Sequence, residues 1–253
     1  MSRPEPAPEP WDVIAQNLPE HARNRIHTDE GARAAGFPAA LVAGVTTYAY
    51  LTHPIVAMWG LDWVRGGGGE VRFRGPVHRG DVITCLPMRD HDVVAVEARV
   101  LGSDRARAVL RAWPESVPEP PARPFDRLAT RHVRLEGEFG SSYGSRAGDD
   151  LDVYEKARVV HPAVWPALAN HVVHAELARG PWIHTRSRIW HHAMAPAGSW
   201  AGVHATVVDR FRRSGERVVL EVIIEVDGRV VATLEHEAIV ELEGRDVDAG
   251  RAD

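Results

Sequence analysis

Hydrophobic residues follow two different periods along this chain, and each period predicts one kind of element. Residues 41–59 are apolar almost without interruption, which is typical of a helix buried on all sides. Pro54 falls inside this stretch, where a proline should end or kink the helix. Residues 70–74, 94–100 and 106–112 instead alternate between apolar and polar positions. This alternation predicts half-buried strands, the last two of which form a hairpin.

The second half of the chain repeats this order. A second apolar helix is predicted from about Pro162 to Ala178. The strands predicted after it are 182–192, 203–211, 218–226 and 230–240. Gly80 and Gly198 mark equivalent turns 118 residues apart, and the same spacing places Gly44 on Pro162, where the two helices should begin. A single spacing that aligns a turn and a helix start predicts a duplicated unit.

A cluster of five prolines between residues 114 and 124 separates the two halves and predicts an extended linker. The predicted fold class is α+β: a tandem double hot-dog, in which an antiparallel sheet wraps one long central helix in each half. Short leading segments are expected at 11–15 and 132–139. The predicted organisation is a disordered tail at 1–10, a unit at 11–113, a linker at 114–125, a unit at 126–243 and a disordered tail at 244–253.

Composition and charge narrow the classes of partner. The net charge of −5 gives no basic surface for nucleic acid, and no apolar run reaches the roughly 18 residues of a membrane span. The start of the chain is rich in proline and glutamate and lacks the apolar core of a signal peptide. Cys85 is the single cysteine, so no intrachain disulfide is expected. These features predict a cytoplasmic protein that binds neither nucleic acid nor membrane.

A run of polar and small residues precedes the first predicted helix. Asn24-Arg25-Ile26-His27-Thr28-Asp29 is followed by Ala32 to Phe37 and by Leu41-Val42-Ala43-Gly44, and then by residues 71–77 and Gly80-Asp81. This combination resembles the MaoC-like, R-specific enoyl-CoA hydratase family, which belongs to the hot-dog superfamily. The resemblance implies a substrate that is an acyl thioester of CoA or of acyl-carrier protein, and a lyase reaction without a cofactor.

In that family an Asp and a His five residues apart form the pair that adds or removes water. His27 matches the His and Asn24 matches the motif's Asn, but the Asp falls on Ala22, which cannot transfer a proton. Each proton-transfer group contributes about 10²–10⁴-fold to such a reaction. Glu20 and His21 are the nearest groups that are able to replace the missing Asp.

The predicted site residues come from both halves. His27, Asn24 and His184 are the predicted catalytic residues, and Asn170, Thr52, Trp182 and Gly44 are predicted to bind substrate. The alternatives are structural: His27 and Asn24 hold a polar loop, and Asn170 and His184 are hydrogen-bonded buried groups. His161-Pro162 is the second half's further counterpart of a site. No metal site is expected, because neither an HExxH motif nor cysteine-rich spacing occurs.

Several functions remain open at this point. A hydratase or dehydratase with a rearranged acid/base pair is the first hypothesis. A hot-dog thioesterase, an isomerase or cyclase of a specialised metabolite, and a non-catalytic acyl-binding protein are the alternatives, since one fold hosts several chemistries. A homodimer is compatible with the sequence.

Overall fold

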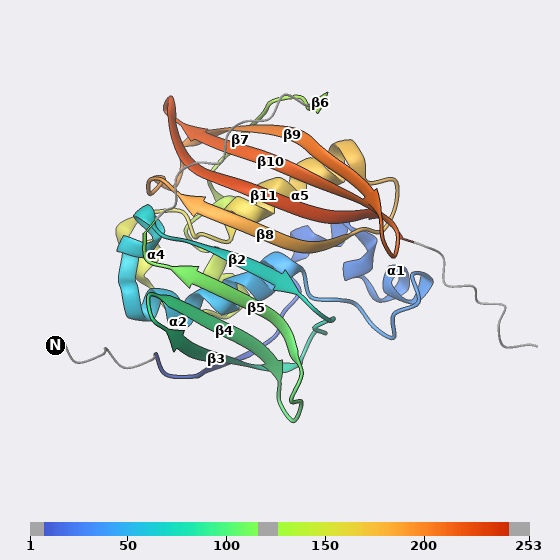
Figure 1. The fold of residues 1–253 in the computed structure, drawn as a ribbon, viewed down its shortest axis with the longest axis horizontal. Coiled ribbons are helices and arrows are strands. Elements are labelled where there is room, and N and C mark those ends of the chain that lie inside the picture. The colour runs from blue at the N-terminus through green and yellow to red at the C-terminus, as the bar shows by residue number, and fades with distance from the viewer. Residues whose placement is uncertain (1–7, 116–125, 243–253) are drawn as a thin grey trace, which may run out of the picture.

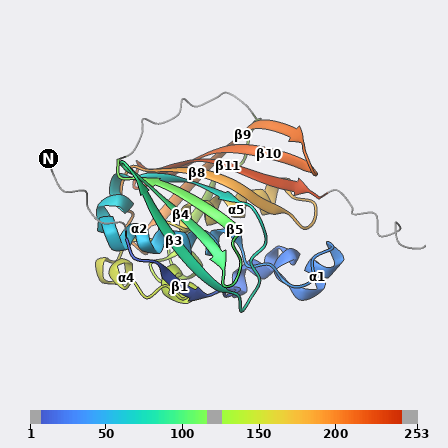
Figure 2. The same cartoon turned by 60° about the horizontal axis from the view of Figure 1, so that its bottom comes forward.

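The computed structural model describes residues 8–115 and 126–242. Figure 1 shows two central helices lying on the same face of one continuous antiparallel sheet. The order of the strands is β1-β3-β4-β5-β2-β8-β11-β10-β9-β6, with β7 paired to β9. Figure 2 shows the sheet curving over both helices, with the short helix α1 at one end of the molecule. Each half is therefore one central helix covered by an antiparallel sheet, as the sequence predicts.

The elements follow the predicted order in both halves. The first half contains β1 (Trp11–Ile14), α2 (Gly44–Gly66), β2 (Gly68–Phe73), β3 (Val82–Asp90), β4 (Val93–Val100) and β5 (Ala106–Trp113). The second contains β6 (Asp126–Arg127), β7 (Arg131–Arg134), α5 (Val164–Val172), the π-helical turn η4 (Val173–Leu177), β8 (Ile183–His191), β9 (Trp200–Arg212), β10 (Glu216–Val226) and β11 (Arg229–Glu241). Short helical turns precede the central helices: η1 (Pro19–Arg23), η2 (Arg25–His27), α1 (Asp29–Ala34), η3 (Gly137–Phe139), α3 (Tyr143–Ala147) and α4 (Val153–Ala157).

Parts of the predicted organisation fall outside the described residues. These are residues 116–125 of the predicted linker, residues 1–7 of the first predicted tail and all of the second. The two halves are joined through the antiparallel pairing of β2 with β8. Across this pairing Arg188 donates to Glu70 at 2.7 Å. Pairing the two half-sheets covers a strand edge in each of them. Within the described ranges, none of the helices combines the length and the apolar character needed to cross a membrane.

The backbone repeats itself at the spacing of 118 residues found in the sequence. The turn glycines Gly80 and Gly198 have φ angles of +90° and +89°. Just before each central helix, Val42 donates to the carbonyl of Val77 at 2.8 Å, and the equivalent Val160 donates to that of Ala195 at 3.0 Å. Equivalent hydrogen bonds and equivalent left-handed turns support a duplicated unit.

Helix α2 departs from helical geometry at Gly60, with φ 61° and ψ −156°, and not at Pro54 as predicted. A proline has no N–H to donate to the carbonyl four residues earlier, which here belongs to Tyr50. The thiol of Cys85 on β3 donates to that carbonyl oxygen at 3.3 Å. The buried acceptor is thereby satisfied, and the helix continues past Pro54.

Candidate active site

Two adjoining pockets lie between the loop region of the first half and helix α5 of the second. The larger has a volume of about 220 Å³ and the smaller of about 60 Å³. Both pockets are lined by Asn24, His27, Asn170 and Trp182, a set of four residues that we call the junction. Gly44 and His184 also line the larger pocket. The fold therefore brings six of the seven predicted site residues together.

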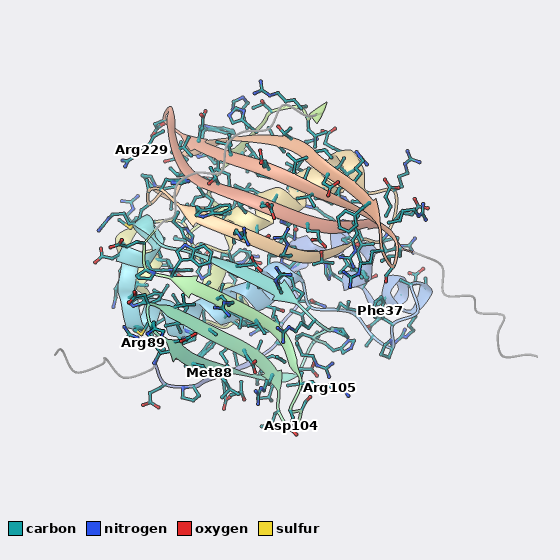
Figure 3. All side chains as sticks on the ribbon, viewed as in Figure 1. Phe37, Met88, Arg89, Asp104, Arg105 and Arg229 are labelled. Carbon is teal, nitrogen blue, oxygen red and sulfur yellow. The ribbon has the colours of Figure 1, made fainter. Side chains whose placement is uncertain are left out.

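The two pockets differ in character. The larger pocket is lined mainly by apolar side chains, among them Ile26, Phe37, Leu41, Phe73, Val77 and Ile183. Figure 3 shows Phe37 beside α1 at the periphery of the molecule. The smaller pocket is lined by polar and charged groups, among them Glu20, His21, Arg23, Glu138, His171 and His174. The junction thus stands where an apolar compartment meets a polar one.

His27 is placed at the junction as a neutral base. Its Nδ1 lies 2.8 Å from the carbonyl oxygen of Leu41, and a carbonyl only accepts, so Nδ1 carries the proton. The other ring nitrogen, Nε2, then has a free lone pair. Burial lowers the pKa of His27 to about 4, although the Leu41 hydrogen bond opposes the shift. At neutral pH the ring is therefore uncharged and able to accept a proton.

Asn24 holds the junction together by its amide. Its Nδ2 donates to the carbonyl of Trp182 at 2.8 Å, and its Oδ1 accepts from the backbone N–H of Ile26 at 3.4 Å. These bonds tie the first half to the start of β8 and fix the turn that carries His27. The arrangement supports a positioning role for Asn24, since a carboxamide is neither an acid nor a base at neutral pH.

His184 closes the larger pocket against the first turn of α2. A Cβ on Gly44 would lie 3.3 Å from Nδ1 of His184, so the absence of a side chain at Gly44 lets the ring approach the helix start. Nε2 of His184 is 2.8 Å from the hydroxyl of Ser187, which lies 2.8 Å from Nδ1 of His236. Burial, and secondarily His236, hold the pKa of His184 well below its usual range.

Asn170 and Thr52 have different surroundings. Oδ1 of Asn170 is buried and has no hydrogen-bond partner within the described residues, so its amide is available to a ligand. Thr52 is fully buried and lines neither pocket. Its hydroxyl donates to the carbonyl of Ala49 at 2.8 Å. The geometry therefore does not support the predicted substrate contact at Thr52, because the hydroxyl is bonded within its own helix.

A hydrogen-bonded network that sequence reasoning did not assemble lies beside the junction. Nε2 of His21 is 3.1 Å from the hydroxyls of both Thr46 and Tyr143, and these two hydroxyls are 3.2 Å apart. The rings of His21 and His27 have centroids 5.9 Å apart. Burial, helped by the neighbouring His27 and by the charges of Arg146 and Arg23, lowers the pKa of His21 to about 3, and burial raises that of Tyr143.

Glu20 has a different partner. Nη2 of Arg146 donates to its carboxylate at 2.6 Å, so this acid is held in an ion pair. In the described part of the chain, neither His27 nor His184 is hydrogen-bonded to a carboxylate. Of the two replacements considered for the missing Asp, His21 is thus the one that faces the junction without an ionic partner.

No protein-family model and no curated protein matches the sequence of this chain. A MaoC-domain protein from Chloroflexus aurantiacus that is named as a dehydratase matches in structure with a TM-score of 0.64, at 12% identity, over 95% of this chain and 97% of that chain. A conserved Mycobacterium tuberculosis protein with a double hotdog fold also gives 0.64 at 12% identity, over 93% and 96% of the two chains.

The chain has a double hot-dog fold. The dehydratase domain of PpsC from Mycobacterium tuberculosis, solved in complex with C12:1-CoA, shares it with a TM-score of 0.53, at 13% identity, over 91% of this chain and 93% of that chain. Acyl-CoA thioesterases also occur among the similar structures. The predicted fold is therefore confirmed, whereas the reaction has to be argued from the site, because one fold hosts several chemistries.

Proposed function

We propose that this double hot-dog protein is an acyl-thioester enzyme of the hydratase or dehydratase type. The observation that carries the proposal is the position of His27, a neutral base whose Nδ1 is held by Leu41 at the junction of an apolar and a polar pocket. The structural likeness to MaoC-like dehydratases supports the same class. The substrate would be an enoyl or 3-hydroxyacyl thioester of CoA or of acyl-carrier protein.

The larger pocket supplies what an acyl thioester needs for binding. Its apolar lining suits a hydrocarbon chain, because burying each CH₂ contributes about 0.8 kcal/mol. Gly44, which lines this pocket, is the first residue of α2, and the first N–H groups of a helix lack intrahelical partners. These donors are suited to hold the thioester carbonyl oxygen as negative charge develops on it, and the unpartnered Oδ1 of Asn170 is suited to accept from a water or a ligand N–H or O–H.

In the proposed hydration, His27 acts as the general base. Its Nε2 takes a proton from a water molecule as the water oxygen bonds to C3 of the enoyl group. The C2–C3 π electrons move toward the thioester carbonyl and form an enolate. C2 then takes a proton from the His21–Tyr143 network. His27 releases the proton that it took and the network regains one, both through solvent, so that each group returns to its starting state. Dehydration follows the same steps in reverse.

The His21–Tyr143 network takes the place of the acid that Ala22 cannot supply. A group acts as proton donor when it is within hydrogen-bond reach or one water away. The separation of 5.9 Å between the His21 and His27 rings is compatible with a water between them. The Tyr143 hydroxyl and the neutral His21 ring both carry exchangeable protons.

The experiment follows two products at once. Purified protein and His27→Gln are given crotonyl-CoA and longer enoyl-CoAs, and loss of enoyl-thioester absorbance and release of free thiol are recorded in parallel. The proposal predicts absorbance loss without thiol release, reduced about 10²-fold or more in His27→Gln. Folded protein that does neither contradicts the proposal and leaves a specialised isomerase or cyclase, or an acyl-binding protein.

Thioester hydrolysis is the second candidate. It is favoured by the lack of a carboxylate hydrogen-bonded to His27 among the described residues, since hydrolysis needs only a water activated by the base and a stabilised oxyanion. Thioesterases also share the fold. Release of thiol by the wild type, lost in His27→Gln, is the result that selects this candidate over hydration.

A further inference from the structure

A second group of polar side chains, all buried except Asp150, lies between helix α2 and the segment that precedes α5. It is separate from the junction, and its residues line neither pocket. We call it the Asp149 cluster. Its members are Tyr48, His53, Asp149, Asp150, Tyr154 and His161.

The 118-residue repeat relates the position of this cluster to that of the junction: each lies between the central helix of one half and the leading segment of the other. Thr52 on α2 and Asn170 on α5 are 118 residues apart, the spacing at which the backbone repeats. Asn170 lines a pocket with the leading segment of the first half, and His53, next to Thr52, contacts Asp149 and Asp150 in the leading segment of the second. The duplicated fold thus has a pocket at one such position and a closed polar cluster at the other.

Asp149 is a buried carboxylate without an ion pair to Lys or Arg in the described residues. Its side chain is 0% exposed, and the nearest basic atoms are Nε2 of His53 at 3.8 Å and Nε2 of His161 at 3.7 Å. Neither Lys nor Arg is ion-paired with it in the described residues. A buried carboxylate without a cation is unfavourable.

Other atoms of the cluster also lack partners. The buried atoms without a hydrogen bond in the described structure include Oδ2 of Asp149, Nε2 of His161, Nδ1 of His53 and the hydroxyls of Tyr48 and Tyr154. Buried polar atoms are nearly always satisfied, by protein, by water or by an ion. Two of these atoms, Oδ2 of Asp149 and Nε2 of His161, lie 3.7 Å apart and face each other, and the other three are compatible with a polar or charged guest.

Three potential ligand atoms of the cluster lie close enough together to hold one metal ion. Nε2 of His53 and one oxygen from each of Asp149 and Asp150 lie within 4.8 Å of one another. Ligand atoms of tetrahedral zinc are about 3.3 Å apart, given metal–ligand bonds of about 2.0–2.2 Å. The distances from His53 Nε2, 3.8 Å to Asp149 and 2.7 Å to Asp150, lie on either side of that value.

We propose that His53, Asp149 and Asp150 bind a divalent transition-metal ion, with Zn²⁺ as the ion that fits best. Two carboxylates balance its charge, and the imidazole favours zinc over calcium or magnesium, which prefer oxygen ligands alone. The ring of Trp11 stacks on His53 at 3.9 Å and fixes its orientation. With three protein ligands, the fourth position would be taken by water. Binding of the ion does not require the proposed hydratase activity, although the rings of His161 and Tyr143 have centroids 5.8 Å apart.

His161 then supports the site without ligating the metal. Its Nδ1 accepts from the backbone N–H of Ala163 at 3.1 Å, so in the neutral ring the proton is on Nε2, which faces Oδ2 of Asp149. A histidine that holds the second oxygen of a ligating carboxylate is a common outer partner of metal sites. The remaining carboxylate oxygen, Oδ1, accepts from the N–H of Leu151 at 2.8 Å.

The test is a calorimetric titration of the EDTA-treated, dialysed full-length protein with Zn²⁺, repeated with Co²⁺ to record its visible spectrum. The expected result is one Zn²⁺ per chain and a rise in Tm. Asp150→Asn and His53→Gln should each weaken binding tenfold or more. The Asp150 side chain is 74% exposed, so its substitution threatens folding little.

A matched control separates this site from adventitious binding. Asp152→Asn alters a nearby exposed acid that pairs with Lys156, and it should leave Zn²⁺ affinity unchanged. Circular dichroism checks that each variant is folded. Absence of Zn²⁺ binding by the wild type overturns the proposal, and so does binding that is equally strong in folded Asp150→Asn and His53→Gln.

Discussion

His27 is a histidine without charge at neutral pH, because burial lowers its pKa to about 4. A general base works in its unprotonated form. The kcat/KM of the wild type should therefore stay constant as the pH falls below 6.5 and decline only near pH 4. Rates on an enoyl-CoA, recorded across the range in which the protein stays folded, check this. An acid limb centred near 6.5 contradicts a buried His27 as the base.

The proton donor can be tested separately from the base. Tyr143→Phe keeps the buried ring and removes the hydroxyl that lies 3.1 Å from His21. We expect kcat to fall about 10²-fold with KM nearly unchanged, since the hydroxyl acts on the transition state. Glu20→Gln is the control, because its carboxylate is occupied by Arg146, and it should change kcat far less. Equal losses in both variants would argue against the network as donor.

The sequence predicted part of this residue-scale picture. His27, Asn24, Asn170, Trp182, His184 and Gly44 meet at one pocket, as residue pattern and resemblance suggested. The partnership of His21 with Tyr143 was not predictable, because 122 residues separate them and the glycines and serines around Tyr143 form no recognisable motif. For Thr52, the sequence placed the residue correctly on the helix but could not show where its hydroxyl points. The hydroxyl donates to the backbone carbonyl of Ala49 and is not available to a substrate.

At the scale of elements, helix α2 depends on a side chain from β3. The thiol of Cys85 donates a hydrogen bond to the Tyr50 carbonyl, to which Pro54 cannot donate because proline has no N–H. Cys85→Ala should lower the free energy of unfolding by about 1–2 kcal/mol, because a buried acceptor loses its donor. In a Pro54→Ala background the helix supplies its own N–H, and the same substitution should be less destabilising. Denaturant unfolding of the four proteins gives the cycle, and equal effects in both backgrounds contradict this role.

The strands and turns were the most predictable elements, because each strand buries one face and repeats every second residue. Gly80 and Gly198 both have positive φ angles, as is common for glycines in turns. The break of α2 at Gly60 was not foreseen. Gly60 directly follows the apolar stretch 41–59, and the expected kink was placed at Pro54 because proline lacks the N–H that a helix interior needs.

The whole molecule buries several uncharged histidines. Burial lowers the pKa of His191 and of His236 to about 3, besides those of His21 and His27. Between pH 6.5 and about 4 the unfolded chain binds protons that the folded protein does not, so stability falls as the pH is lowered through this window. Each such histidine lowers the free energy of unfolding by up to about 1.4 kcal/mol per pH unit.

Denaturant unfolding at pH 7.5 and 5.5 measures this loss. His191 gives the sharpest comparison, since neither of its buried ring nitrogens has a hydrogen-bond partner in the described structure. His191→Leu should make the loss between the two pH values smaller by about 1.4 kcal/mol. Stability that is the same at both pH values contradicts the burial of neutral histidines.

The central claim is that His27 is the base of an acyl-thioester site, and kcat/KM on a trans-2-enoyl-CoA tests it most directly. His78 is the matched control, because its Nδ1 also lies near a backbone carbonyl, that of Ala40 at 3.2 Å, while it lines neither pocket. We predict that His27→Gln lowers kcat/KM about 10²-fold or more and that His78→Gln leaves it within about twofold of the wild type. Equal activity in all three proteins, each shown to be folded, would contradict the account.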